Sequence, residues 1–469
     1  MEQRVDRIAL INLEGDLEVV SPDGAEHRRL SGGERVFHFP AWAPDGGRIA
    51  AIGGNRLRAG VFVFPDAAHG LRMNDEHAVY ESTRNAPIYL YWSPNGDHIS
   101  FLAARVDEHS MGLHVVDADA PSEQTPAPLV TGRPCFWDWT PDGRRILIHV
   151  GGWDSGRGAQ LTMVDPFAPN GAARTSVARP GMFQSPGIAC SGRYRAFGHL
   201  TRRNEMQLVI DPVVDEVAGV DRRTRIAVRH TGVAAMTWSP TNDELAFISP
   251  LEPMRTYYGP LRLMNVEGED VRVLTDDVVL AFFWSPDGRK IAYFTVAQAA
   301  EAIRMLMPDV VEAARAGGHL ALHDIDEVTE EEIAAAIDEV ASEEEDMIGA
   351  EVDDDAPYEG ASDDDDADDA DEPDLWLNLW VVDVQSGEQT LVSTFEPADL
   401  FVNQFLPFFD QYAKSHRIWS PDSDAIVLPV MRRLPGGGKM PRICVAPIDP
   451  LRGRLSEIAD GIMAFWSPC

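Results

Sequence analysis

The amino-acid sequence predicts an all-β fold, an eight-bladed β-propeller built from four-stranded blades. Three observations carry this prediction. A Trp-Ser-Pro-Asp-Gly unit recurs along the 469 residues, its copies follow a nearly constant spacing, and each end of the chain holds part of one unit. The chain is 44% hydrophobic and 8% aromatic, a composition that suits a large folded core.

The most regular copy of the unit, residues 283–294, is typical of a strand, a tight turn and a second strand. Pro286-Asp287-Gly288 provides the fixed φ and the positive φ that a reversal needs. The copies are centred on Trp42, Trp92, Trp139, Ile188, Trp238, Trp284, Trp419 and Trp466. Their spacings are 50, 47, 49, 50, 46, 135 and 47 residues, so one long insertion interrupts a period that is typical of propeller blades.

A third and a fourth strand complete each unit. Residues 113–117 and 261–265 are examples of the third strand, and residues 271–275 are an example of the fourth. One such sheet cannot bury both of its faces, whereas sheets stacked around a ring bury each other.

The two ends of the chain complement each other. Strand-like segments at 7–11, 17–20 and 26–30 open the sequence, and the last copy, residues 461–469, stops after its first strand. We therefore expect the C-terminal strand to be the innermost strand of a composite blade that the N-terminus completes. This closure removes the open edges of the ring.

Three regions follow from the interruption: propeller at 1–297, an insert at 298–373, and propeller again at 374–469. Apolar spacing predicts a helix over 298–315, and a Thr cap with an acidic first turn predicts another from Thr329. The Asp-rich stretch 350–374 is expected to form no stable structure.

Charge is concentrated in the insert. The formal net charge is −36, but residues 324–374 hold 26 of the 76 acidic residues and no Lys or Arg. The rest of the chain has 50 acidic and 40 basic residues, and this small negative net charge is common in soluble proteins. Four dispersed cysteines, no secretory signal and no long apolar run predict a cytoplasmic protein without membrane insertion. We also expect it to be monomeric outside its complex. The acidic balance also argues against nucleic acid as a partner.

The repeated unit, seen in Phe283-Trp284-Ser285-Pro286-Asp287-Gly288, resembles that of the TolB-like, WD40-like Pro-Asp-Gly propeller family. It also resembles the propeller domains of prolyl-oligopeptidase-type enzymes. The resemblance covers about 1–297 and 374–469 and implies a fold rather than a function. Ile188 stands where the family has Trp, and TolB itself is smaller and periplasmic. The chain has no room for the separate hydrolase domain that carries prolyl-oligopeptidase chemistry.

Enzyme motifs are absent from the sequence. It contains no GxSxG, HExxH, phosphate-binding GxxxxGK[ST] or dinucleotide fingerprint. His319 and His323 have the spacing of a metal-binding pair on a helix, but an exposed turn in the acidic insert is the interpretation we favour. We predict no catalytic residue, no metal and no cofactor.

In propellers of this family, the second-to-third and fourth-to-first strand connections emerge on the face opposite the Pro-Asp-Gly turns. We call this the loop face and the opposite one the turn face. The insert and the long aromatic connector at 395–416 are both expected on the loop face. The basic residues of its second-to-third connections are Arg56, Arg58, Arg105, Arg157, Arg202, Arg203, Arg255, Arg432, Arg433 and Lys439.

The aromatic connector has two interpretations. Its aromatic residues are Phe401, Phe405, Phe408, Phe409 and Tyr412. They could plug the central channel, or they could form a recognition surface together with Asp410, Gln411 and His416.

The leading hypothesis for function is a non-enzymatic scaffold that binds another protein, possibly a basic one, through the loop face. The acidic insert would then attract that partner, shield the basic residues of the loop face, or serve only to keep the protein soluble. The alternative is a small-ligand binder or a hydrolase- or lyase-type enzyme. It would bind an anionic substrate at the channel mouth with Asp410, Tyr412, His416 and loop arginines.

Overall fold

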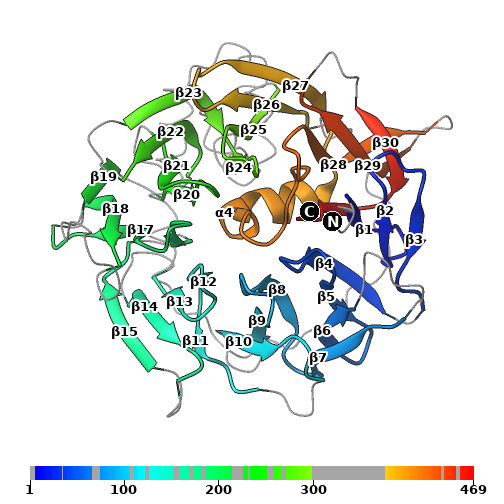
Figure 1. Ribbon diagram of the computed structural model, residues 1–469, viewed down its shortest axis with the longest axis horizontal. Coiled ribbons are helices and arrows are strands. Elements are labelled where there is room, and N and C mark those ends of the chain that lie inside the picture. The colour runs from blue at the N-terminus through cyan, green and yellow to red at the C-terminus, as the bar shows by residue number, and fades with distance from the viewer. Residues whose placement is uncertain are drawn as a thin grey trace, which may run out of the picture. The chain divides into compact units, whose positions relative to one another are not determined.

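Eight antiparallel sheets follow one another around a ring in the computed structural model (Figure 1). The structure describes residues 6–33, 35–65, 74–105, 110–121, 126–152, 158–168, 173–181, 185–203, 205–213, 225–230, 233–250, 257–266, 271–297, 375–434, 438–449 and 455–468. Arg157, Arg255, His319, His323 and the two helices predicted in the insert lie outside these residues.

The chain divides into two compact units. The ring belongs to the first unit, Met1–Thr295 with Asn378–Cys469, and the second is Val296–Leu377. Most of the second unit lies outside the described residues.

Each of the first four blades has four strands. From the innermost strand outward, blade 1 is β31 (Met463–Trp466), β1 (Ile8–Ile11), β2 (Leu17–Val20) and β3 (His27–Arg29). Blade 2 is β4 (Val36–Trp42), β5 (Ile49–Gly54), β6 (Ala59–Phe64) and β7 (His77–Ser82). Blade 3 is β8 (Pro87–Trp92), β9 (His98–Arg105), β10 (Ser110–Asp117) and β11 (Val130–Gly132). Blade 4 is β12 (Cys135–Trp139), β13 (Ile146–Val150), β14 (Gln160–Asp165) and β15 (Ala173–Ala178).

The remaining blades follow the same order. Blade 5 is β16 (Gly187–Ile188), β17 (Tyr194–Leu200), β18 (Met206–Pro212) and β19 (Arg225–His230). Blade 6 is β20 (Ala235–Trp238), β21 (Glu244–Ile248), β22 (Gly259–Asn265) and β23 (Val271–Val279). Blade 7 is β24 (Ala281–Trp284), β25 (Lys290–Val296), β26 (Leu377–Asp383) and β27 (Gln389–Phe395). Blade 8 is β28 (Ala425–Arg433), β29 (Lys439–Pro447) and β30 (Ser456–Asp460).

The eight-bladed fold and its closure are confirmed. β31 pairs with β1 in antiparallel register from Ile8 opposite Trp466 to Ile11 opposite Met463, so the C-terminal strand is innermost in the composite blade. In blade 8 the inner position is shorter than a full strand. There Trp419 forms an isolated bridge with Ile426, and the Val427 N–H donates to the Ile418 carbonyl oxygen at 2.8 Å.

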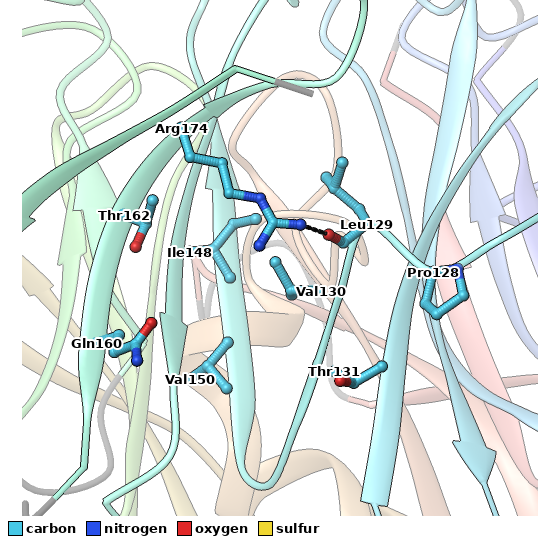
Figure 2. A pocket seen from close by; sticks show the side chains of 9 residues that line it. All are labelled: Pro128, Leu129, Val130, Thr131, Ile148, Val150, Gln160, Thr162 and Arg174. Carbon is cyan, nitrogen blue, oxygen red and sulfur yellow. Dashed lines mark hydrogen bonds between the residues drawn. The ribbon is translucent and has the colours of Figure 1, made fainter. Parts of the chain in front are cut away.

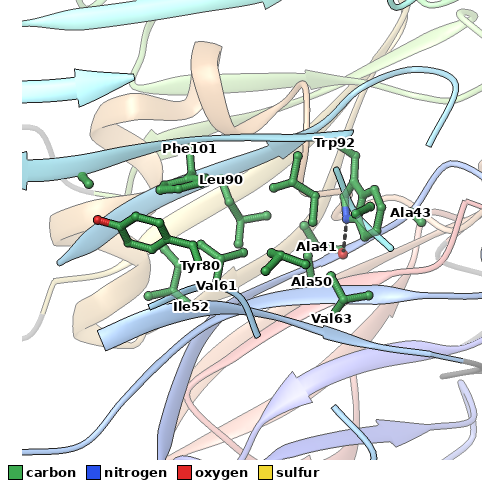
Figure 3. Close-up of a cluster of buried hydrophobic side chains, with 14 residues drawn as sticks. Ala41, Ala43, Ala50, Ile52, Val61, Val63, Tyr80, Leu90, Trp92 and Phe101 are labelled. Carbon is green, nitrogen blue, oxygen red and sulfur yellow. Dashed lines mark hydrogen bonds between the residues drawn. The ribbon is translucent and has the colours of Figure 1, made fainter. Parts of the chain in front are cut away.

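The tryptophan of the repeat joins neighbouring blades. Trp92 Nε1 donates to the Ala41 carbonyl oxygen at 2.9 Å, and Ala41 directly precedes Trp42 in blade 2 (Figure 3). Trp419 Nε1 donates in the same way to Phe283 O at 3.0 Å, directly before Trp284. The repeat therefore places a buried donor where the preceding blade offers a carbonyl, beside an apolar core that contains Val61 and Phe101.

The Pro-Asp-Gly turn is held by its own polar groups. The Asp287 carboxylate accepts hydrogen bonds from Ser285 Oγ at 2.6 Å and from the Arg289 N–H at 3.0 Å. Gly288 has φ 68°, and its N–H donates to Ser285 O at 2.9 Å. A Cβ on Gly288 would lie 2.1 Å from Thr241 Oγ1, so this position requires glycine both for its φ and for the close approach of the neighbouring turn.

Candidate functional site

The aromatic connector fills the centre of the ring. After β27 it continues as η2 (Phe401–Phe405), η3 (Leu406–Phe408) and α4 (Phe409–Tyr412), and Figure 1 shows α4 inside the ring. The Phe405 ring stacks on Phe283 of β24 with centroids 5.4 Å apart and also contacts Phe465 of β31. Phe401, Phe405, Phe409 and Tyr412 are all buried. The geometry is that of a plug, the first of the two interpretations, and we call residues 398–416 the plug.

A side-chain amide fixes the plug to blades 3 and 4. Gln411 Oε1 accepts the Trp137 N–H at 3.1 Å, and Gln411 Nε2 donates to Trp137 O at 3.0 Å. The Tyr89 hydroxyl of β8 donates to the Gln411 carbonyl oxygen at 2.9 Å. These bonds satisfy backbone groups of the inner strand β12 that have no strand partner on the channel side.

Buried charges lie between the plug and β12. Lys414 Nζ lies 3.7 Å from Asp138 Oδ2 and donates to Ser185 Oγ at 3.0 Å. Asp138 also accepts the Tyr91 hydroxyl at 3.1 Å and the Ile188 N–H at 2.8 Å. Burial lowers the pKa of Lys414 and raises the pKa of Asp138, while the attraction between the two charges opposes both shifts.

Asp410 and His416 are buried in the same region. Burial raises the pKa of Asp410 to about 6, although the positive charge of Lys414 acts in the opposite direction. Burial lowers the pKa of His416 to about 3, so its ring is neutral at pH 7. His416 Nε2 lies 3.2 Å from Phe39 O, and since a carbonyl only accepts, Nε2 carries the proton.

The structure separates the predicted site residues into two groups. The plug residues Phe409, Asp410, Tyr412 and His416 are buried, whereas Phe408 is 37% exposed. Arg56, Arg58, Arg202 and Arg203 are exposed in second-to-third connections. The other basic residues expected there lie at strand ends instead, because the strands extend further than predicted: Arg105 ends β9, Arg432 and Arg433 end β28, and Lys439 begins β29. Arg433 is exposed, whereas Arg105 and Arg432 are half-buried.

Ion pairs on the loop face include Arg432 and Lys439. Arg432 Nε lies 3.0 Å from Glu457 Oε1. Lys439 Nζ lies 2.5 Å from Glu396 Oε1.

The hairpin tip of blade 2 has a defined shape. Asn55 Oδ1 accepts hydrogen bonds from the Leu57 N–H at 2.9 Å and the Arg58 N–H at 3.0 Å. The Asn55 N–H donates to the Arg58 carbonyl oxygen at 2.9 Å, which closes the turn. This arrangement leaves the Leu57 side chain 78% exposed between two exposed arginines.

Two more exposed apolar residues belong to elements that are bonded to one another near this tip. Val36, 45% exposed, is the register partner of Gly54, the residue directly before the tip. The turn of blade 1 that carries Leu13, 42% exposed, is bonded to β4 because the Phe37 N–H donates to the Gly15 carbonyl oxygen at 2.7 Å. We call Leu13, Val36, Arg56, Leu57 and Arg58 the blade-2 tip surface.

The sequence reasoning missed two features of these sites. Leu57 was not considered, although a leucine between two arginines directly after a strand is a readable sign of an exposed apolar residue. Asp138 and Lys414 were not singled out either. Asp138 could have been found because it lies between Trp137 and Trp139 on an inner strand. The equivalent position of the repeat in blade 7 is the apolar residue Phe283.

Two grooves lie between blades. One, of about 260 Å³, lies between β11 and the strands β13 to β15, with Val130, Ile148 and Val150 on its apolar side; Arg174 reaches across it to donate to Leu129 O (Figure 2). The other, of about 640 Å³, lies between blades 6 and 7 and contains Arg272 and Arg289. Among the described residues, no group of three or more His, Cys, Asp or Glu side chains could hold a metal ion.

This chain resembles known proteins in its fold. No family model and no curated protein matches the chain. Among solved structures, a putative TolB from Agrobacterium tumefaciens is 15% identical over 58% of this chain and 90% of its own, with a TM-score of 0.35. A eukaryotic initiation factor is 10% identical over 99% of both chains, with a TM-score of 0.47. An oligogalacturonate lyase from Vibrio parahaemolyticus is 9% identical over 97% of this chain and 85% of its own, with a TM-score of 0.43.

At these identities the likeness concerns the fold alone, and TolB proteins are among the matches, as the repeats predict. In the part of the chain that the structure describes, no helix is long and apolar enough to span a membrane.

Proposed function

We propose that the protein is a non-enzymatic interaction scaffold whose working surface is the loop face. The observation that carries this proposal is the contrast, among the described residues, between a buried plug at the ring centre and an exposed apolar tip on the loop face. The plug buries its aromatic side chains, whereas the blade-2 tip surface holds Leu57 out in water between two arginines. Exposed apolar side chains in a polar surround mark surfaces that bind other molecules.

The buried plug residues favour the scaffold over the channel-mouth alternative. Tyr412 and His416 face the interior, and a ligand could reach them only if the plug left the channel. Gln411 and Lys414 oppose that movement because they bond to β12 and to Ser185. A substrate site at these residues would therefore require the loss of several buried hydrogen bonds.

The acidic insert adds a second, electrostatic element to the proposal. With 26 acidic residues and no basic one, residues 324–374 would attract a basic partner at long range and at low salt. We place the protein in the cytoplasm, as a monomer outside its complex, with another protein as the partner and without nucleic acid.

Charge reversals on the two faces test the proposal. Each variant replaces two exposed arginines by glutamate, and the variants are R56E/R58E and R202E/R203E on the loop face and R144E/R289E on the turn face. Tagged full-length proteins capture partners from cytosol, and quantitative mass spectrometry compares the captured sets with that of the wild type. Loss of a partner with either loop-face variant, but not with the turn-face variant, supports the scaffold. Equal capture by all three variants contradicts it.

A further inference from the structure

Local hydrogen bonds define the shape of the β5–β6 hairpin tip. The Asn55 side chain accepts both the Leu57 N–H and the Arg58 N–H, and the Asn55 N–H closes the turn onto Arg58 O. Three local hydrogen bonds thus fix the direction in which Leu57 points. A preformed tip loses little conformational entropy when a partner binds it.

Two further exposed apolar residues lie in the same region of the fold as the tip. Leu57, Val36 and Leu13 are the exposed large apolar side chains of this region, and they come from blade 2 and the adjoining turn of blade 1. The contact between these two blades is close, because a Cβ on Gly15 would lie 2.4 Å from Val36 Cγ1. The strand pairing and the hydrogen bond to Gly15 therefore place the three residues in one region of the loop face, where blades 1 and 2 meet.

The charge of the surface is positive. Within the described part of the chain, Arg56 and Arg58 form no ion pair. Other arginines of the first two blades do: Arg7 pairs with Glu26 at 2.5 Å, Arg29 with Asp16, and Arg35 with Glu76 at 3.3 Å. Glu14, next to Leu13, is an exposed carboxylate near this surface. Among the described residues these two guanidinium groups have no carboxylate partner, and each has the planar shape for a bidentate contact with a carboxylate.

We propose that the blade-2 tip surface is the docking site for a segment of a partner protein in which an apolar side chain is flanked by carboxylates. The apolar side chain of the partner covers Leu57 and Val36, and the carboxylates pair with Arg56 and Arg58. This inference rests on the proposed function and narrows it to one place on the loop face. It concerns an acidic segment of the partner, which is distinct from the basic region that the insert would attract.

Defined peptides provide the probe for full-length protein. One fluorescent peptide carries Leu-Phe between aspartates, a second carries Leu-Phe between lysines, and a third carries Ser-Ser between aspartates. Fluorescence anisotropy measures the dissociation constant of each peptide at low and at high salt. The wild type should prefer the first peptide and should bind it more weakly at high salt, because exposed ion pairs are screened.

Matched variants locate the site. R56E/R58E should weaken binding of the aspartate peptide by roughly tenfold and should reverse the preference toward the lysine peptide, because two attractions become two repulsions. L57S should weaken both Leu-Phe peptides and leave the Ser-Ser peptide unchanged. R202E/R203E carries the same charge change on the same face and should bind all three peptides as the wild type does.

The outcomes distinguish this inference from the proposed function. Loss of binding with R202E/R203E, but not with R56E/R58E, overturns the docking site and leaves the loop face as the working surface. Loss of peptide binding only with the turn-face variant R144E/R289E overturns both the docking site and the loop face as the working surface. If the wild type binds the three peptides equally well, the docking site is wrong.

The chain's own insert is the other occupant to exclude. Residues 324–374 also combine apolar and acidic residues. If deletion of these residues tightens binding of the aspartate peptide to the full ring, the surface belongs to the insert, and the assignment to a partner protein is wrong. Unchanged binding after the deletion supports the partner protein.

Discussion

Replacing Lys414 by methionine tests the buried charges that hold the plug. Methionine keeps most of the volume of the side chain but removes the positive charge that lies 3.7 Å from Asp138 Oδ2. It also removes the hydrogen bond from Nζ to Ser185 Oγ at 3.0 Å. Asp138 and Asp410 are both buried, so two carboxylates would lose their nearby cation.

The expected loss follows from this geometry. Breaking a buried pair by removing one partner costs about 3–5 kcal/mol, because the remaining charge stays buried. We expect the free energy of unfolding of K414M to fall by about this amount at pH 7.5 and by less at pH 5, where the carboxylates of the folded variant take up protons. The double variant K414M/D138N should recover part of the loss. Recovery stays partial because the substituted amide keeps one acceptor oxygen, whereas Asp138 accepts from both Tyr91 and Ile188.

Urea unfolding followed by tryptophan fluorescence measures these differences. The matched control is K290M, since Lys290 is only half-buried at the start of β25, and it should change the unfolding free energy by less than about 0.5 kcal/mol. A loss below about 1 kcal/mol for K414M, or a loss that is the same at pH 5 and pH 7.5, would refute the account of the buried charges.

Three further substitutions give expected outcomes. D410N should flatten the pH dependence of stability. Burial raises the folded-state pKa of Asp410 from 3.8 to about 6, so this carboxyl favours folding at low pH, and its contribution of up to about 3 kcal/mol is lost as the pH rises from 3.8 through 6. Urea titrations at several pH values measure this change. W92F leaves the Ala41 carbonyl without its indole donor and should cost about 1–3 kcal/mol, seen as a lower denaturation midpoint. G288A should cost at least about 1 kcal/mol through its positive φ and the contact with Thr241, and the substitution T241A should recover only the part due to the contact.

The fold could be predicted from the sequence because its repeated unit is local. Trp92 and its equivalents mark the end of each inner strand, and the turn that includes Gly288 depends on residues within a few positions of each other. The shared blade was predictable for the same reason, since each end of the chain carries part of the unit. The shortened inner strand around Trp419 was not, because strand length there depends on pairing with β28 and on the plug that precedes it.

The site was less predictable because it depends on contacts between distant segments. The aromatic content of the connector suggested a plug, but the pairing of Gln411 with Trp137 joins residues 274 positions apart. Lys414 and Asp138 likewise meet only in the ring. The arginines of the loop face followed from topology, whereas the exposure of Leu57 depends on the hydrogen bonds of Asn55, which residue types alone do not specify.

Photo-crosslinking from position 57 tests the central claim most directly. A photoreactive amino acid replaces Leu57 in the full-length protein in cells, and the same residue replaces Leu391 on the outer strand β27 as a control with 43% exposure. The account predicts a defined adduct with another protein from position 57, which the change R56E/R58E removes, and no such adduct from position 391. An adduct that forms equally from both positions would contradict the claim that the loop face is the working surface. An adduct from position 57 that persists unchanged in R56E/R58E would contradict the docking site.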